Sequence, residues 1–517
     1  MKKNVLALSI AAMIGGLGFV GTASADLIPG TGGVSNAEKP VNLDGLRVKG
    51  DNTSRMSVTT AGNLTLSEGG MGHMLLVPYY SAQNNNMTVL HVVNTDSVNG
   101  KAVKVRFRGA LNSDDILDFQ VFMSPGDVWT AAVSAGSDGV ATLTTGDGTC
   151  TLPALAKGVP QAFVQDRLNP AMSAADKANN TREGYVEIFN MADIPENTAT
   201  TSLYTAIKHV NGVAPCTASV LNATLVNHTT ETSAAGAGFN TPTTGLYGDW
   251  YIINVAQTTT FSGGATAITA LTPAGVAGRG NFVHFPQNAN ANGSPINFSA
   301  DPLFRTDSKD AAGVTVSGAK IAAANYDLPD LSTPYTVLAG LSATPALRPL
   351  AQATNLTNAI KVTSITNQYA NDASISAKTD WVFSMPTRRY NVAVNYAANT
   401  AVYATGAAYF TSGNTEYDAT KKQVCVKSKF DDLAYFNTEE GVKVTTPGGY
   451  VVSPQKPGVT PGLAFCGETS VLTFNKTLGA TDGTPVLGAL IARQGLQMVS
   501  KANSTDVYTD GWMALQT

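Results

Sequence analysis

Charged residues are scarce in this chain of 517 residues. They make up 14% of the sequence, against about 25% in a typical soluble domain. The net charge is −4 and the isoelectric point is about 5.8, so the basic surface of a nucleic-acid-binding protein is not expected. Apolar residues at 43% and aromatic residues at 8% still provide material for hydrophobic cores. The composition is therefore not that of a disordered chain.

The sequence also lacks the short motifs that identify common catalytic sites. It contains no G-x-S-x-G, no H-E-x-x-H and no Walker loop. A retaining glycosidase needs only two carboxylates about 5 Å apart, which a sequence does not reveal. No pattern in this sequence indicates a glycosidase. No metal-ligand spacing is found among the five histidines, which are His73, His91, His209, His228 and His284. We expect no enzyme, no catalytic residue and no cofactor-binding residue.

Cysteine is rare, and its spacing favours disulfides. No C-x-x-C motif occurs among the four cysteines, Cys150, Cys216, Cys425 and Cys466. Four cysteines allow three pairings, and the sequence does not choose among them. Pairing of neighbours along the chain is the simplest prediction, Cys150 with Cys216 and Cys425 with Cys466. Each of these two bridges would contribute about 4 kcal/mol in the chain-entropy model.

The longest apolar run lies at the start of the chain. Two lysines (residues 2–3) precede the apolar residues 5–20, and Ala-Ser-Ala follows at residues 23–25. This is the pattern of a secretory signal peptide, and it predicts cleavage between Ala25 and Asp26. The alternative is a retained N-terminal anchor, although the run is short and glycine-rich for a membrane span. No later run of this kind predicts a transmembrane helix in the mature chain.

Alternating and β-branched runs predict many short strands. Residues 87–95 (MTVLHVVNT) form one such run, and His91 within it is expected to be a hydrogen-bonded sheet residue rather than a metal ligand. Residues 101–108 (KAVKVRFR) alternate apolar side chains with lysine and arginine. The DSVNG between the two runs supplies turn residues, with Asn99-Gly100 as a tight corner. We predict a hairpin of these two strands with its basic face in water.

A third strand is predicted in ILDFQVFM, at residues 116–123. Its odd-numbered residues from 117 to 123 are all apolar and share one face. If this strand lies beside residues 101–108, Asp118 faces Arg106 or Arg108. Such a cross-strand pair contributes about 0.2–1 kcal/mol.

Four aspartates lie within DDILDFQVFMSPGDVW, at residues 114–129. Ser124-Pro125-Gly126-Asp127 has turn chemistry, because proline and glycine set the dihedrals that a turn requires. Trp129 follows in an apolar run and is expected to fill a hydrophobic core. The aspartates are therefore interpreted as structural, with a calcium site built from Asp114 and Asp115 as the alternative.

The whole pattern indicates an all-β chain, with Ig-like or related β-sandwich domains, long inserted loops and few short helices. Further strands are predicted at residues 185–190, 249–255, 380–384, 390–396 and 470–474, and helices at 161–167, 173–179 and 350–359. Residues 256–345 are expected to hold long connections or an insertion. The predicted divisions are a signal peptide at 1–25, an N-terminal arm or edge segment at 26–66, a β-sandwich domain at 67–260, an insertion plus further strands of the β core at 261–400, and a β-rich C-terminal segment with a disulfide at 401–517.

Six blocks of sequence occur in a specific order and spacing. They are GHMLLVPYYSAQ (72–83), TVLHVVNT (88–95), KAVKVRFRGALNSDDILDFQVFMSPGDVW (101–129), REGYVEIFNMADIP (182–195), GLYGDWYIINV (245–255) and TDWVFSMPTRRY (379–390). Together they resemble a family of secreted cell-surface proteins of Gram-negative bacteria, some of them surface-layer (S-layer) proteins. Asn190 departs from the pattern, because a second acid is expected there. That departure weakens the idea of a shared acidic site near Glu187.

The resemblance implies a structural role on the cell surface and supplies no catalytic residues. The expected function is self-assembly into an extracellular layer outside the outer membrane. The expected partners are other copies of the chain and an outer-membrane glycolipid, with calcium as a candidate bridge between copies. One alternative is a secreted adhesin or glycan-binding protein, for which Tyr79 and Tyr80 are the best local binding candidates. The second alternative is an outer-membrane porin.

Overall fold

A computed structural model gives the fold of the chain. The structure describes residues 26–32, 56–284 except 166, 226, 227 and 229, and then 321–322, 348–361, 364–370, 380–396, 398–403, 408–427, 433–437, 458–460, 464–474, 485–488 and 510–516. The predicted signal peptide, and with it Ala25 at the predicted cleavage site, lies outside the described residues. Among the described helices, none is both long enough and apolar enough to cross a membrane.

Seven antiparallel strands form the first large sheet, called the central sheet below. Their order is β10 (Cys150–Leu152), β7 (Asp115–Met123), β6 (Gly100–Gly109), β12 (Glu183–Ile194), β4 (Met74–Ser81), β15 (Thr266–Leu271) and β2 (Asn63–Leu66). The predicted edge segment thus supplies β2 at one end of this sheet. The strands predicted at 101–108 and 116–123 are confirmed as β6 and β7; they are neighbours in the sheet, and Arg106 lies directly opposite Asp118.

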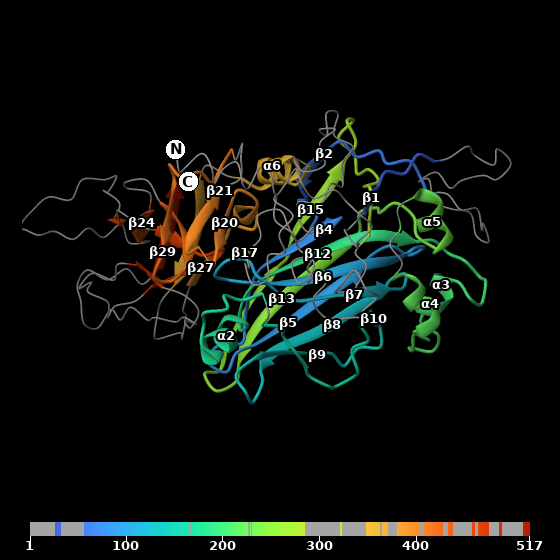
Figure 1. The fold of residues 1–517 in the computed structure, drawn as a ribbon, viewed down its shortest axis with the longest axis horizontal. Helices are drawn as coiled ribbons and strands as arrows, with labels where there is room; N and C mark the ends of the chain where they lie inside the picture. The colour runs from blue at the N-terminus through green and yellow to red at the C-terminus, as the bar shows by residue number, and fades with distance from the viewer. Residues whose placement is uncertain are drawn as a thin grey trace, which may run out of the picture.

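A second sheet, called the outer sheet, lies against the central sheet (Figure 1). Its order is β11 (Gln161–Ala162), β9 (Ala141–Thr144), β8 (Val128–Ala135), β5 (Met87–Asn94), β13 (Leu246–Asn254) and β14 (Thr259–Gly264), with β3 (Met71–Gly72) paired to β13. Along β8 buried residues alternate with partly exposed or exposed ones. Such alternation is typical of an antiparallel sheet with one covered face.

The two sheets enclose one hydrophobic core. Val105 of β6 and Phe119 of β7 meet Leu90 of β5 and Trp129 of β8 within it. Trp129 is fully buried and its ring centroid lies 5.6 Å from that of Phe119. The prediction that Trp129 fills a core is therefore confirmed, and so is the all-β sandwich.

The far face of the central sheet is covered as well. A second core joins it to α3 (Leu203–Ile207), α4 (Ala218–Ala223), α5 (Glu231–Gly236), α6 (Arg348–Ile360) and the pair β1 (Asp26–Ile28) and β16 (Phe282–His284). Figure 1 shows α3, α4 and α5 together at one end of the sheets. Every residue of β6, β7 and β12 is buried. These three strands thus form a middle layer that is covered on both faces.

The remaining strands form four small antiparallel sheets, drawn in yellow to red in Figure 1. Their strand orders are β17 (Ile321–Ala322), β20 (Val392–Asn395), β21 (Thr400–Tyr403); β18 (Ser364–Ala370), β29 (Asp510–Gln516), β24 (Leu433–Asn437), β25 (Gly458–Thr460); β19 (Asp380–Ser384), β27 (Thr469–Phe474), β28 (Pro485–Gly488); and β22 (Thr415–Asp418), β23 (Gln423–Lys427), β26 (Ala464–Cys466). The 3-10 turn η4 (Arg388–Tyr390) precedes β20. These sheets are called the C-terminal sheets below.

Three sequence predictions about the fold are wrong. Strands β5 and β6 do not form a hairpin, because β5 pairs with β8 and β13 while β6 pairs with β7 and β12. The basic face of β6 is buried rather than wet. The helix predicted at 161–167 is absent, because residues 161–162 form β11 and an irregular segment follows among the described residues.

The β5–β6 connection is a corner that passes from one sheet to the other. The Asn94 side-chain amide donates to the carbonyls of Asn99 and Ser124, both at 2.9 Å. The Asp96 carboxylate accepts from the backbone N–H of Val98 and Asn99. The residues have the turn chemistry that was predicted. Their hydrogen bonds build a crossover between sheets instead of a hairpin.

The helices predicted at 173–179 and 350–359 are confirmed as α2 (Ala174–Asn180) and α6. Helix α2 begins at Ser173, whose hydroxyl accepts from the backbone N–H of Asp176. An N-cap of this kind satisfies one of the four N–H groups that a helix start leaves open. The short helices α3, α4 and α5 were not predicted.

Candidate functional site

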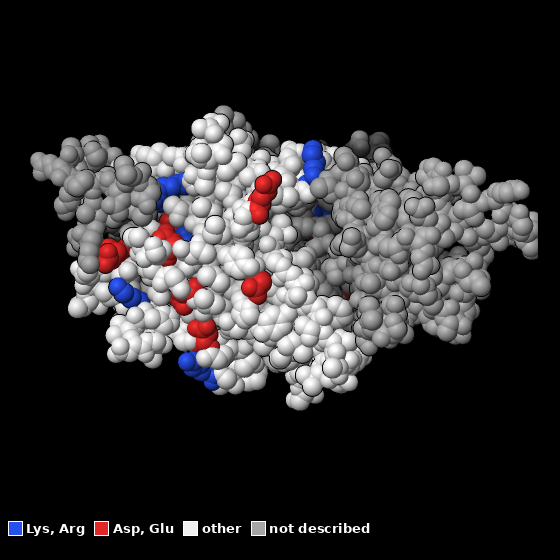
Figure 2. All heavy atoms as spheres, turned by 180° about the vertical axis from the view of Figure 1, so that it is seen from behind, with Lys and Arg blue, Asp and Glu red and all other residues white. Residues whose placement is uncertain are grey.

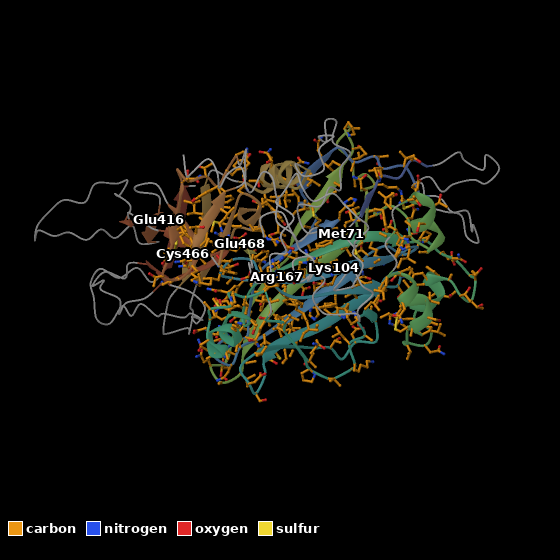
Figure 3. The ribbon with its side chains drawn as sticks, viewed as in Figure 1. Met71, Lys104, Arg167, Glu416, Cys466 and Glu468 are labelled. Atoms are coloured by element: carbon orange, nitrogen blue, oxygen red, sulfur yellow. A yellow bond between two sulfur atoms is a disulfide. The ribbon has the colours of Figure 1, made fainter. Side chains whose placement is uncertain are left out.

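The basic residues of β6 are the most unusual feature of the described chain. Lys101, Lys104, Arg106 and Arg108 are each at most 1% exposed. Long basic side chains are almost never buried to this extent unless a carboxylate pairs with them. Figure 3 labels Lys104 within the stacked sheets.

Each of these cations lies beside a buried acid. Lys104 contacts Asp118, and the Arg106 Nε lies 3.3 Å from Asp115 Oδ2. The Arg108 Nε lies 3.2 Å from Glu187 Oε2, and the Lys101 Nζ lies 2.9 Å from Asp193 Oδ1. The charges are therefore matched inside the protein. We call this set the buried ion-pair network.

The predicted position of Asp118 opposite Arg106 is confirmed by the register of the sheet. Asp118 also forms an ion pair with Lys104, one diagonal step away, which was not predicted. Its energetics also differ from the surface estimate. Breaking a buried pair costs about 3–5 kcal/mol, because it leaves an uncompensated charge.

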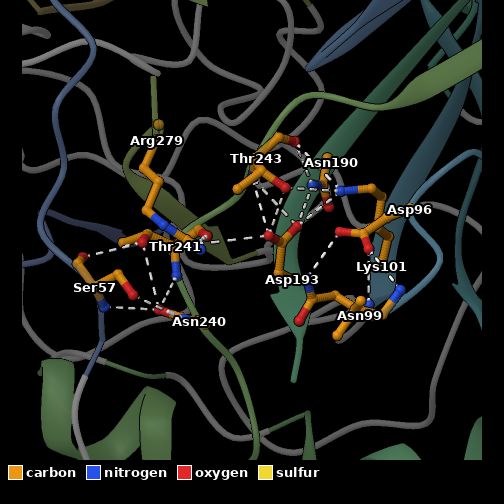
Figure 4. Close-up of polar contacts among 12 residues, drawn as sticks. Ser57, Asp96, Asn99, Lys101, Asn190, Asp193, Asn240, Thr241, Thr243 and Arg279 are labelled. Carbon is orange, nitrogen blue, oxygen red and sulfur yellow. Dashed lines mark hydrogen bonds and ion pairs between the residues drawn. The ribbon is translucent and has the colours of Figure 1, made fainter. Parts of the chain in front are cut away.

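The pair of Lys101 and Asp193 sits in a dense set of hydrogen bonds (Figure 4). The Thr243 hydroxyl donates to Asp193 Oδ2 at 2.7 Å, and the Asn190 amide donates to Oδ1 at 2.9 Å. Burial alone would raise the pKa of Asp193. Lys101, Arg279 and these hydrogen bonds outweigh it and hold the pKa below its usual value.

The geometry gives a reason for the departure at Asn190. Its amide donates both to Asp193 and to the carbonyl of Thr243, at 2.9 and 3.1 Å. An acid at this position would remove the donor and place a second negative charge beside Asp193. A buried like-charge pair of that kind is costly.

The network continues into the C-terminal sheets through Glu187. The Arg389 Nη1 lies 3.9 Å from Glu187 Oε1, opposite the contact that Arg108 makes. The neighbouring Arg388 pairs with Glu468, whose Oε2 lies 2.5 Å from the Arg388 Nε. Glu187 is thus a junction between β12 and the segment that carries η4.

The turn between β6 and β7 is held by backbone contacts at the same place. The carbonyl of Ala110 accepts from the N–H of Glu468 at 2.7 Å and of Thr469 at 3.2 Å. Gly467 has a positive φ of 84°, and a Cβ there would lie 2.6 Å from the Ala110 oxygen. Only glycine allows this close approach. The disulfide Cys425–Cys466 lies next to this glycine.

Both predicted disulfides are confirmed. Cys150–Cys216 closes 66 residues and Cys425–Cys466 closes 41, and among the described residues no cysteine is free. The first bridge ties the end strand β10 of the central sheet to the segment before α4. The second ties β23 to β26.

The two calcium candidates point into different contacts. Asp114 Oδ2 accepts from the Tyr396 hydroxyl at 2.5 Å, and Asp115 lies beside Arg106. Among the residues that the structure describes, no group of three or more histidine, cysteine or acidic side chains has the arrangement of a metal site. Asp114 instead links the β6–β7 turn to the C-terminal sheets.

The histidines are placed separately. His73 is fully buried, and burial is the main cause that lowers its pKa to about 4. Its Nδ1 accepts from the backbone N–H of Ala270, so Nε2 carries the proton and donates to the Gly278 carbonyl. Three others each form a hydrogen bond with one side chain, namely His91 with Asp249, His209 with Ser124 and His228 with Ser233. His91 is thus a hydrogen-bonded sheet residue, as predicted.

Tyr79 and Tyr80, the binding candidates of the adhesin alternative, are buried at 4% and 0% exposure. The Tyr80 hydroxyl donates to the Thr181 carbonyl at 2.9 Å, and that of Tyr79 donates to Glu183 at 2.6 Å. Burial raises the pKa of Glu183 to about 7, against the opposing effect of the Tyr79 hydrogen bond. Both tyrosines belong to the interior and not to a surface platform.

Sequence reasoning missed the acids and bases that complete the network. Arg388, Arg389 and Glu468 had no assigned role, although the paired arginines stand in the block TDWVFSMPTRRY. Their partners are distant in the sequence, since Arg388 and Glu468 are 80 positions apart. Chain-local patterns do not reveal such pairs.

Comparison of the chain with protein-family models, with curated proteins and with solved structures finds no match. A proposal of function therefore rests on the geometry of the chain and on its sequence pattern.

Proposed function

We propose that this chain is a structural cell-surface protein that assembles side by side into an extracellular layer. The observation that carries the proposal is the distribution of charged side chains between the interior and the surface. Among the described residues, the four cations of β6 and the acids that pair with them are buried in the ion-pair network and not exposed. On the face in Figure 2, charged side chains are few and scattered among uncharged ones.

A surface of this kind favours contact between identical copies. Net charge far from zero keeps proteins apart by repulsion, whereas a weakly charged surface offers little resistance to association. Tiling a surface requires each copy to meet several others through heterologous contacts. The covered central sheet and the two disulfides supply a frame stiff enough to carry such contacts.

The strand β14 is the best candidate contact on the described surface. Among the described strands it pairs with β13 alone and so ends the outer sheet. Its sequence, TTFSGG, has no charge and no proline. Charge, proline, short length and coverage are the usual means by which end strands avoid pairing with other chains. The opposite end strand, β11, has two residues and is protected by its shortness.

The family resemblance supports the same proposal and adds the location, outside the outer membrane of a Gram-negative bacterium, with a surface glycolipid as the attachment partner. The secreted adhesin remains the competing proposal. It loses Tyr79 and Tyr80 as binding residues, because both are buried.

The test is assembly of the purified mature protein. Protein extracted in denaturant is dialysed into buffer with and without calcium, and then imaged by electron microscopy and measured for mass. Ordered arrays in either buffer support the proposal, and arrays only with calcium would add a metal to the contacts. A refolded protein that stays monomeric at high concentration in both buffers contradicts it.

A pair of variants tests the contact at β14. Thr260 is exposed on β14, and Thr200 is exposed in the loop before α3. Thr260→Lys places a charge on the strand end and is expected to reduce array formation at least tenfold. Thr200→Lys adds the same charge away from it and is expected to leave arrays intact. Equal effects of the two variants would remove β14 from the contact.

A further inference from the structure

The side chains of Lys104 and Asp118 are in direct contact, as an amine and a carboxyl group must be before they can react. They stand on the neighbouring strands β6 and β7, both are fully buried, and the Lys104 Nζ contacts Asp118 Oδ1. In the sheet register Lys104 is opposite Gln120 and Arg106 is opposite Asp118. The amine therefore reaches diagonally across the ladder to the carboxyl group. Holding two groups in contact in this way removes most of the entropic barrier to a reaction between them.

The surroundings of the pair oppose the charged form of Lys104. Burial lowers the pKa of Lys104 to about 8; Asp118 acts against this and Arg106 adds to it. In a dry site, transfer of one proton from the ammonium to the carboxylate removes two buried charges. A neutral amine and a neutral carboxylic acid then remain in contact. These are the reactants of an amide condensation.

The local charges stay balanced if that pair disappears. The site holds two cations, Lys104 and Arg106, and two acids, Asp115 and Asp118. Arg106 lies 3.3 Å from Asp115, so condensation of the other two leaves one matched ion pair. The number of buried charges falls by two.

We propose that Lys104 and Asp118 become joined by an intramolecular amide bond between β6 and β7. The lone pair of the neutral Nζ attacks Cγ of the protonated Asp118 carboxyl group. The bond from Cγ to the hydroxyl oxygen breaks, and that oxygen leaves as water with one proton from Nζ. Asp115 is the acid beside the pair that can carry this proton. No oxidant or co-reactant is consumed.

Lys101 and Asp193 provide an internal comparison. They are also fully buried and in contact, at 2.9 Å. Asp193, however, has Arg279 at 3.7 Å as a second cation, and it accepts from Thr243 and Asn190. These cations and hydrogen bonds hold the pKa of Asp193 below its usual value, so the protonation that condensation requires is costly there. One amide bond is expected, not two.

The mass of the intact wild-type protein, with its disulfides reduced, tests the proposal without any variant. The expected value is lower than the sequence mass by one water molecule. Trypsin should then fail to cut after Lys104 and should release a branched peptide of residues 102–106 joined to 109–157. Ordinary cleavage after Lys104 with the full sequence mass overturns the proposal. A water loss that maps elsewhere, such as Asp147-Gly148, overturns it too.

Two matched variants locate the bond. Lys104→Arg keeps the positive charge but does not condense, so the full sequence mass should return. Lys101→Arg, on the same strand, should keep the loss of one water. If Lys104→Arg does not fold, the branched wild-type peptide still decides. If Lys101→Arg has the full sequence mass and Lys104→Arg does not, the bond is at Lys101 and Asp193, and the assignment is contradicted.

Discussion

The central sheet and the outer sheet are both antiparallel, but charged side chains are buried on the first and partly exposed to solvent on the second. On the central sheet, Lys104, Arg106 and Arg108 are buried against acids. On the outer sheet, Asp249 contacts His91, and the two side chains are 40% and 29% exposed. The difference lies in what covers each sheet. The central sheet has a core on each side, whereas the outer sheet has one core and one face in solvent.

This difference bears on whether the buried ion pairs contribute to stability or to the connection of particular segments. Replacing such pairs by apolar residues is often neutral or stabilising, so they are weak evidence for stability. Here the pairs connect particular elements, because Glu187 joins β6 to η4 and Asp193 joins β6 to Arg279. The network therefore specifies which segments dock on the central sheet.

The largest expected effect is at Glu187. Glu187→Gln removes the acid that both Arg108 and Arg389 contact and leaves two buried guanidinium groups without it. The free energy of unfolding should fall by about 3–5 kcal/mol. Urea denaturation measures it. A loss below about 1 kcal/mol would mean that the pair behaves like a surface pair.

The next effect in size concerns the disulfide at the end of the central sheet. Cys150 and Cys216 close a loop of 66 residues. The double variant Cys150→Ala/Cys216→Ala should lose about 4 kcal/mol, because the unfolded chain regains the entropy of the open loop. Urea denaturation with and without reductant measures this. If reductant destabilises the double variant as much as the wild type, the effect belongs to Cys425–Cys466 instead.

Glu183 should make stability depend on pH. Its folded pKa of about 7 lies above the ordinary 4.5, so between these values the folded state binds more protons than the unfolded state. The free energy of unfolding therefore falls as pH rises through this window, by about 3 kcal/mol in total. The groups that face it are Tyr79 and Tyr80.

Glu183→Gln tests this contribution. The variant keeps a polar side chain but does not ionise, so it should be more stable than the wild type above pH 7. Below pH 4.5 the two proteins should have similar stability. Urea denaturation at several pH values measures the difference. A wild-type minus variant difference that does not change with pH would show that Glu183 does not titrate in this window.

Much of the architecture could be predicted from the sequence. The alternation in KAVKVRFR and ILDFQVFM predicts the strands β6 and β7, and Ser124–Asp127 forms the expected turn, with Gly126 at a positive φ of 70°. Pairing of neighbouring cysteines was right. These features depend on residues that are close in sequence, where propensity and turn chemistry act directly.

The rest depends on contacts between distant segments. An alternating strand with lysines and arginines predicts a wet face, because such residues are usually exposed. Lys101 and Asp193 are 92 positions apart in the sequence, and no local pattern predicts that they are in contact in the fold. The corner between β5 and β6 was misread for the same reason. A turn sequence sets the local dihedrals, but the partners of the two strands decide whether it closes a hairpin or crosses between sheets.

The smallest effect is expected on the outer sheet, and it completes the comparison. Asp249→Asn removes the charge that faces His91 across β13 and β5, where Oδ1 lies 2.7 Å from Nδ1. Water screens this pair and can solvate the histidine that remains, so the cost should stay within about 1 kcal/mol. Added salt should reduce even this difference. Urea denaturation of this variant beside Glu187→Gln, at low and high salt, gives both values. If Asp249→Asn costs as much as Glu187→Gln, exposure is not what separates the two sheets.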